Sequence, residues 1–397
     1  MVRPAPAFPA PQRGPAPHAR PAALFPPPPL PQRPLLLKGH ERPLTVVKFN
    51  ADGDLLLTAA KDKSVCMWSV ESGERIGTFD GHSGAIYGLD VTRDSRFLLT
   101  GSADNTVRIW NLLTGACLVV IEVRGPCRGV AWAEGEREFA VISDRFRDHA
   151  AAVSIFTFDP DAPEATPTAP RLVISDKENP TVNYTKVGWL PLNEGVLVGL
   201  ETGALRSLDP LRAHTRGEWR AHNDAVTSFS FDETKTLMVT SSKDQSAALW
   251  DVKEMRKVHT YSLDVPCNAI ALSPVKEHVI LGGGQDAMAV TTTAASAGKF
   301  ETRFHHMIFE HELGRVKGHF GPINTLAFAP DGRSFASGAE DGYVRLHKLD
   351  TDYMTLGDDD NLEDEALAVA LRDGTFEQLE EEEALEQARQ EAVDAAN

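Results

Sequence analysis

Four histidines share the same polar residues at the same distances further along the chain. Each is followed after 18 residues by Thr or Ser, after 22 by Asp and after 28 by Trp or His. The sets are His40, Thr58, Asp62 and Trp68; His82, Thr100, Asp104 and Trp110; His222, Thr240, Asp244 and Trp250; and His319, Ser337, Asp341 and His347. An imidazole beside a hydroxyl and a carboxylate could serve as a general base or bind a metal. Four matches at identical spacing favour a structural repeat instead, in which each histidine finds its partners within its own repeat.

Apolar residues follow the same spacing. Positions 7 and 9 after each histidine are apolar, as at Leu89 and Val91, and this interval of two predicts a half-buried strand. Asp52-Gly53 and Asp331-Gly332 then supply residues that tolerate positive φ, which predicts a tight turn into the next strand. The repeat, roughly 42 residues long, therefore consists of short strands joined by tight turns.

The repeat begins with Gly-His and ends near Trp-Asp or Trp-Asn, so it resembles the WD-repeat family. That resemblance implies four-stranded blades arranged as a β-propeller. It also implies that the four polar residues hydrogen-bond in series, with Trp donating, Thr or Ser relaying, His bridging and Asp accepting.

The spacing predicts seven blades, with origins at residues 40, 82, 123, 180, 222, 263 and 319. The third requires about five extra residues in the hairpin around 145–149. In the sixth, overlaying Leu281 to Thr291 on the second blade places Thr291 in the tryptophan position. Two further intervals between blade origins are longer than the repeat, and their extra residues are interpreted as insertions at 159–170 and 294–315. The seventh blade lacks a fourth strand of its own, and we expect Leu35–Lys38 to supply it and close the ring.

The two ends differ in composition from the repeats. We predict a Pro-rich disordered extension at 1–33, one propeller domain at 34–353 and an acidic tail at 354–397. Residues 1–34 hold thirteen of the 26 prolines and cannot pack a core; Pro28, Pro31 and Arg33 also match a pattern that SH3 domains bind. The tail has the composition of two short helices, either solvated or used for docking.

Charge and motifs exclude several functions. The formal net charge is −17, which disfavours direct nucleic-acid binding. Cys66, Cys117, Cys127 and Cys267 lack metal-ligand spacing and are expected to be reduced and buried. Gly282-Gly283-Gly284 is interpreted as a blade turn, because no Gly-Lys-Ser/Thr follows. With no nucleophile placed beside a base and no apolar run long enough to cross a membrane, we expect a non-enzymatic, cofactor-free, metal-free cytoplasmic protein.

Two stretches, at 278–293 and 298–332, are more specific than a generic repeat, and a third at 35–45 accompanies them. LLLKGHERPLT at 35–45, HVILGGGQDAMAVTTT at 278–293 and GKFETRFHHMIFEHELGRVKGHFGPINTLAFAPDG at 298–332 resemble subunit i of eukaryotic translation initiation factor three. SGAEDGYVRLHKLD at 337–350 strengthens the resemblance. It implies a non-catalytic scaffold that contacts subunits b and g and reaches the small ribosomal subunit through the complex, supporting messenger RNA recruitment. An adaptor in signalling or ubiquitin-ligase substrate recognition is the alternative that the repeat alone allows.

An apolar cluster in the stretch at 298–332 is the candidate partner surface. Phe300, Phe304, Met307 and Phe309, together with Ile308, exceed what one outer strand can bury. Aromatic and Met residues contribute much of the energy of protein interfaces. We therefore predict that some of them contact a helix of subunit b, unless they cover their own blade.

Overall fold

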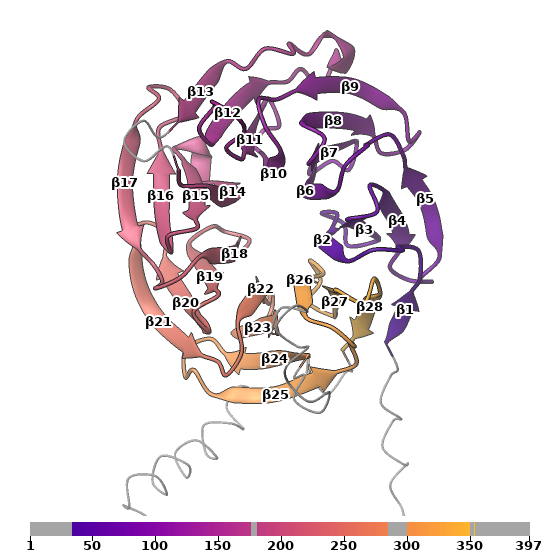
Figure 1. Ribbon diagram of the computed structural model, residues 1–397. Helices are drawn as coiled ribbons and strands as arrows, with labels where there is room; N and C mark the ends of the chain where they lie inside the picture. The colour runs from indigo at the N-terminus through magenta and orange to yellow at the C-terminus, as the bar shows by residue number, and fades with distance from the viewer. Residues whose placement is uncertain (1–33, 176–180, 285–299, 350–352, 354–397) are drawn as a thin grey trace, which may run out of the picture. The chain divides into compact units, whose positions relative to one another are not determined.

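The computed structural model describes residues 34–175, 181–284, 300–349 and 353, which form seven antiparallel sheets of four strands each. Figure 1 shows the sheets arranged around a common centre, with β2, β6, β10, β14, β18, β22 and β26 innermost. The predicted all-β, seven-bladed propeller is confirmed. The predicted disordered extension at 1–33 and the predicted acidic tail at 354–397 lie outside the described residues.

The first four blades follow one another along the chain. Blade one contains β2–β5, at Leu44–Phe49, Leu55–Ala60, Val65–Ser69 and Arg75–Phe79. Blade two contains β6–β9, at Ile86–Val91, Phe97–Ser102, Thr106–Asn111 and Cys117–Glu122. Blade three contains β10–β13, at Cys127–Trp132, Glu138–Ser143, Ala152–Thr157 and Leu172–Ser175. Blade four contains β14–β17, at Tyr184–Trp189, Val196–Leu200, Ala204–Leu208 and Thr215–Arg220.

The last three blades complete the ring. Blade five contains β18–β21, at Val226–Phe231, Leu237–Ser242, Ser246–Asp251 and Arg256–Ser262. Blade six contains β22–β25, at Cys267–Leu272, His278–Gly283, Glu301–His306 and Glu312–Lys317. Blade seven contains β26–β28, at Ile323–Phe328, Ser334–Ala339 and Val344–Lys348, together with β1 at Leu35–Leu37. In the described part of the chain, two short 3-10 helices lie in loops, η1 at Pro163–Ala165 and η2 at Pro191–Asn193.

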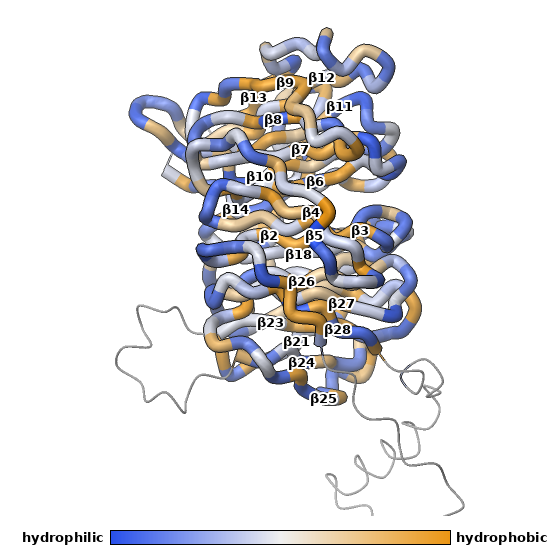
Figure 2. The backbone as a smooth tube through the Cα atoms, turned by 90° about the vertical axis from the view of Figure 1, so that its right-hand side faces the viewer, coloured by the Kyte–Doolittle hydropathy of each residue, from blue (hydrophilic) through white to orange (hydrophobic). Residues whose placement is uncertain are grey.

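The hydrophobic core lies between blades rather than within them. Seven clusters of buried apolar residues occur, and each joins two adjacent blades. Between blades one and two, for example, Leu57 and Met67 pack with Leu89 and Trp110. In the side view of Figure 2 the hydrophilic residues gather in the loops on both faces, with apolar strands between them. A blade on its own would expose both of its apolar faces, so each depends on its neighbours.

The turns and the ring closure agree with the sequence. Gly53 and Gly332 have φ of 76° and 67° in their turns, and a Cβ on Gly332 would lie 2.6 Å from Val275 Cγ2. The predicted closing strand is confirmed, because β1 pairs antiparallel with β28, with Leu36 opposite Arg345.

The innermost strand of every blade contains an irregularity that sequence reasoning missed. Its pairing shifts by one residue, five positions after the blade origin, at Thr45, Tyr87, Arg128, Thr185, Thr227, Asn268 and Asn324. Such a bulge re-aims the side chain of the extra residue.

Three of these bulge residues join their blade to the next. The side chain of each donates to a backbone carbonyl: Thr45 Oγ1 to Ile86 O at 2.6 Å, Thr227 Oγ1 to Cys267 O at 2.6 Å and Asn324 Nδ2 to Leu44 O at 3.1 Å. The bulge thus provides a polar latch between the edges of adjacent blades.

The third blade has the predicted form. An eight-residue connection at 144–151, containing a bridge between Phe146 and His149, replaces the usual tight turn between β11 and β12. The predicted insertion at 159–170 lies in the connection from β12 to β13, which contains η1.

The sixth blade corrects the sequence alignment. Val279 pairs with His305, whereas the corresponding residue Leu98 of blade two pairs with Trp110. His305, and not Thr291, therefore occupies the tryptophan position. The predicted insertion at 294–315 is therefore wrong. The extra residues of blade six come before its third strand, at 285–299, which lie outside the described part of the chain. Residues 301–306 are the third strand itself.

The closure leads to a test by truncation. Deleting residues 1–33 is expected to leave the midpoint of thermal unfolding unchanged, because β1 begins at Leu35. Deleting residues 1–38 removes β1 and leaves β28 as an unpaired edge, so this protein should aggregate or become protease-sensitive. Thermal unfolding and limited proteolysis of both truncations measure the difference. Equal resistance of the two would show that β1 does not hold the ring closed.

Candidate functional site

The polar residues repeated in the sequence form linear hydrogen-bonded chains in blades one and two. In blade two, Trp110 Nε1 donates to Thr100 Oγ1 at 2.9 Å. His82 Nε2 lies 2.8 Å from the same hydroxyl, and His82 Nδ1 lies 3.0 Å from Asp104 Oδ2. Blade one repeats this with distances of 2.9, 2.8 and 2.8 Å. Every polar group of the two tetrads thus has a partner in its own blade.

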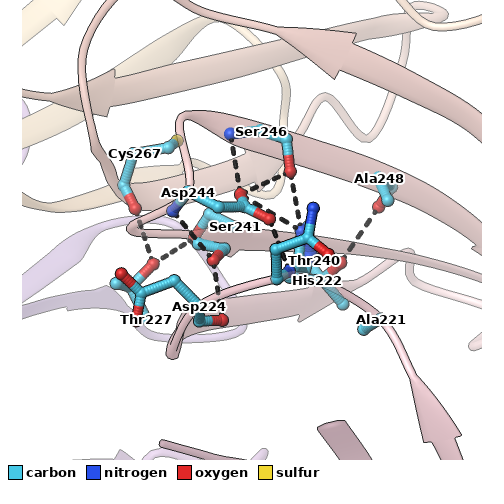
Figure 3. Close-up of polar contacts among 12 residues, drawn as sticks. Ala221, His222, Asp224, Thr227, Thr240, Ser241, Asp244, Ser246, Ala248 and Cys267 are labelled. Atoms are coloured by element: carbon cyan, nitrogen blue, oxygen red, sulfur yellow. Dashed lines mark hydrogen bonds and ion pairs between the residues drawn. The ribbon is translucent and has the colours of Figure 1, made fainter. Parts of the chain in front are cut away.

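Blade five departs from the expected chain at one point. His222 Nε2 lies 2.8 Å from Thr240 Oγ1, as expected. His222 Nδ1, however, bonds to Ser246 Oγ at 2.8 Å, and Ser246 Oγ in turn donates to Asp244 Oδ1 at 2.6 Å (Figure 3). The signal for this relay was a hydroxyl residue 24 positions after the histidine, which also occurs as Ser64 and Thr106.

Blade seven keeps only part of the chain. His319 Nδ1 lies 3.1 Å from Asp341 Oδ2, and His319 Nε2 lies 2.8 Å from Ser337 Oγ. His347 takes the place of tryptophan and stacks on Phe335, with ring centroids 4.5 Å apart. It contributes packing where blades one, two and five have an indole donor.

The aspartates also join two loops in each of the four blades that have a tetrad. Asp104 accepts from the backbone N–H of Ser83 at 2.8 Å and from that of Thr106 at 2.9 Å. Asp341 bonds in the same way to the N–H groups of Phe320 and Tyr343. A carboxylate that accepts several N–H bonds is held in its ionised form. The tetrad therefore fixes the loop that enters a blade against the turn between its second and third strands.

The pKa values reflect burial and these bonds. Burial lowers the pKa of His222 to about 4, outweighing the attraction of Asp244. For Asp104, burial alone would raise the pKa, but hydrogen bonds from Thr106, Ser83 and His82 lower it to about 2. In blade one, burial alone would lower the pKa of His40. The hydrogen bonds of His40 to Asp62 and Cys66 outweigh this effect and raise its pKa to about 9.

The described residues contain no group of three or more His, Cys, Asp or Glu placed to hold a metal ion. Within the same part of the chain, no helix has the length and apolar character to cross a membrane. Cys66, Cys127 and Cys267 are buried free thiols, whereas Cys117 is exposed, contrary to expectation. Burial raises the pKa of Cys127 and of Cys267 to about 12, so both are poor nucleophiles.

The structure separates the four predicted partner-binding residues. Phe304 is 7% exposed and packs in the core between blades six and seven, so it is not available to a partner. Met307 packs against the core between blades five and six. Phe300 is half-buried, and its ring lies where a Cβ on Gly284 would collide with it. Phe309 is 45% exposed and is the accessible member of the set.

Phe309 belongs to a turn that blade five helps to hold. Together with Ile308, which is 44% exposed, it forms the turn patch between β24 and β25. Tyr261 of β21 donates its hydroxyl to Met307 O at 2.6 Å. His259 of β21 lies 2.7 Å from the Glu310 carboxylate. The turn patch is thus held by two side chains of blade five, where blades five and six meet.

Seven four-stranded blades, four of which have three or four members of the His–Thr/Ser–Asp–Trp chain, define a WD-repeat β-propeller. The family model EIF3I matches residues 32–359, which include every described strand. The chain belongs to the family of eukaryotic translation initiation factor 3 subunit I, and a role in translation initiation follows from that membership.

Individual relatives carrying that subunit name support the assignment. The one from Schizosaccharomyces pombe is 42% identical over 324 residues, which cover 81% of this chain and 98% of the relative. Those from Nematostella vectensis and Xenopus tropicalis are each 41% identical, over 321 and 322 residues, with the same coverage of 81% and 98%. The similarity therefore extends over nearly the whole of each relative.

The tetrads lead to a stability prediction. Asp104→Ala leaves His82 Nδ1 and two backbone N–H groups without their acceptor, and we expect a loss of roughly 1–3 kcal/mol in the free energy of unfolding. Asp244→Ala should cost a similar amount. Asp148→Ala, at an exposed position in the loop before β12, is the control and should change stability by less than about 0.5 kcal/mol. Chemical denaturation of the three variants measures these differences; equal losses in all three would contradict the assigned network.

Proposed function

We propose that this chain is a non-catalytic scaffold subunit of translation initiation factor 3, supporting assembly of the preinitiation complex on the small ribosomal subunit and recruitment of messenger RNA. Membership of the subunit I family carries this proposal. The chain would work in the cytoplasm as part of the assembled factor, with subunits b and g as its chief partners. Its contact with the ribosome would be indirect, through the complex.

The architecture is suited to a scaffold. Adjacent blades share apolar clusters, and the polar tetrads fix the loops of four blades. A surface with loops held in this way can bind several partners at fixed relative angles and loses little conformational entropy on binding. Both imidazole nitrogens of His40, His82, His222 and His319 are used within the blades, which favours a structural role for these groups over proton transfer.

The turn patch is the proposed contact for a helix of subunit b. An exposed aromatic side chain beside an aliphatic one is a typical anchor for the apolar face of an amphipathic helix. The neighbouring His259–Glu310 pair would supply polar contacts at the rim. Because Phe304 is buried, the surface is smaller than the sequence suggested and is centred on blades five and six.

Co-sedimentation tests the function. The chain, expressed at its native level with an affinity tag, should travel with 40S subunits on a sucrose gradient and should co-purify with the other subunits of the factor. Gradients are run at low and at physiological ionic strength, because salt screens electrostatic contacts between the chain and these partners. A signalling or ubiquitin-ligase adaptor would remain at the top of the gradient. That result would reject the proposal.

Substitutions in the turn patch test the docking surface. Phe309→Asp places a charge in the proposed apolar contact and should weaken binding to a fragment of subunit b by about 2 kcal/mol or more. Leu113→Asp is the matched control, since Leu113 is 92% exposed in the equivalent turn of blade two. Calorimetry measures binding, and thermal unfolding shows whether each variant is folded. Retained binding by a folded Phe309→Asp variant would remove the turn patch from the interface.

A further inference from the structure

The centre of the propeller encloses a cavity of about 630 Å³ that is lined by all seven innermost strands. Successive side chains of each innermost strand point toward the two neighbouring blades, as Val130 and Ala131 do, so the cavity is bounded by the inner edges of the blades. Several of the lining residues are small and uncharged, such as Gly188, Ser228 and Ser230. The small side chains leave the central channel open.

Charged residues are few on the lining, and most have a counter-ion. They are Lys48, Asp90, Arg128, Lys186, Asp232, Glu233 and Lys235. Lys48 pairs with Asp90, Arg128 with Asp144, and Lys235 with Glu134. Three of the four cations are therefore neutralised by neighbouring carboxylates.

Lys186 is the fourth cation, and it pairs with no carboxylate of the described residues. It follows the bulge at Thr185 on β14, and it is half-buried in the channel lining. Asp90, the carboxylate of the channel wall, already accepts Lys48 at one oxygen and the backbone N–H of Trp132 at the other, at 2.7 Å. Asp232 and Glu233 lie beyond the end of β18, at the rim.

The surroundings of Lys186 disfavour a lone positive charge. Burial lowers the pKa of its ammonium group, and repulsion by Lys48 lowers it further, against a weaker attraction by Asp90. An ammonium group taken out of bulk water without a counter-ion is destabilising. Ser228 and Ser230, on the neighbouring strand β18, line the same cavity. The Ser230 hydroxyl donates to Phe231 O at 3.5 Å, a long hydrogen bond that an anion would replace. An ammonium group without a carboxylate partner, beside hydroxyl groups, suits the oxygens of an anion.

We propose that the central channel binds a small oxyanion, the phosphate or carboxylate group of a small molecule, with Lys186 as its principal ligand and Ser228 and Ser230 as further donors. The anion would neutralise the cation that the channel wall leaves unpaired. This site is separate from the turn patch and does not depend on the proposed contact with subunit b.

Binding to the full chain can be measured with sodium phosphate and with sodium succinate, at constant ionic strength maintained with sodium chloride. At least one probe should give saturable calorimetric binding at or below roughly 1 mM and raise the midpoint of thermal unfolding. Whichever probe binds more tightly identifies the group for which the site is built. Chloride alone should not reproduce the effect.

Lys186→Met removes the charge and keeps most of the stem, and it should weaken binding by about tenfold or more. Without an anion this variant should unfold at the same or a higher temperature than the natural chain, because the unpaired charge is gone. Lys186→Arg should retain binding. Lys253→Met, an exposed lysine in the turn after β20, is the charge-matched control and should bind as the natural chain does. No binding of either probe at roughly 1 mM, or equal affinities of the folded Lys186→Met and Lys253→Met proteins, would overturn the proposal.

Discussion

Face-to-face packing between adjacent blades is the interaction on which the rest of this structure depends. Each sheet is apolar on both faces, and every cluster of buried residues draws members from two blades. No blade can bury its surface without both neighbours, so the stable arrangement is one in which the last blade meets the first. The core between blades seven and one, where Leu44 packs with Leu346, is therefore as necessary as any other.

The polar groups adjust around this apolar framework. Where a blade has the full tetrad, the chain from Trp to Asp satisfies every donor and joins two loops. In two blades that lack the indole another ring fills its place: His347 stacks on Phe335 in blade seven, and Phe156 stacks on Phe139 in blade three. Packing at this position is thus kept in blades that lack the hydrogen bond. The loops of blades without a tetrad are correspondingly free to vary in length, and blades three and six carry the longer connections.

Much of the fold could be predicted from the sequence because the repeat is local and recurs at fixed spacing. The origins near His40, His82, His222 and His319 required only counting, and the missing fourth strand of blade seven pointed directly to Leu35–Lys38. Blade six was misaligned because His305 replaces the tryptophan and an insertion separates strands that are usually adjacent. Without its marker residue, apolar periodicity alone could not distinguish the third strand from the insertion.

The candidate surfaces were harder to predict, because exposure depends on contacts between distant parts of the chain. Phe304 and Phe309 are the same residue type and lie five residues apart, yet Phe304 is in the core and Phe309 is in an exposed turn. The latch from Thr45 to Ile86 O and the unpaired charge of Lys186 likewise arise from neighbouring blades. Each is a property of the assembled ring that no single repeat contains.

The pairing of β1 with β28 also orders the events of folding. The closing strand leaves the ribosome before any blade has been made, and its partner is the last strand of the propeller to be synthesised. Blades one to six can collapse on one another as they emerge, through contacts between near neighbours in sequence, but the ring must wait for its most distant contact. Until then the apolar edge of β28 and the unpaired β1 are both exposed, which makes the final step of synthesis the one most vulnerable to aggregation.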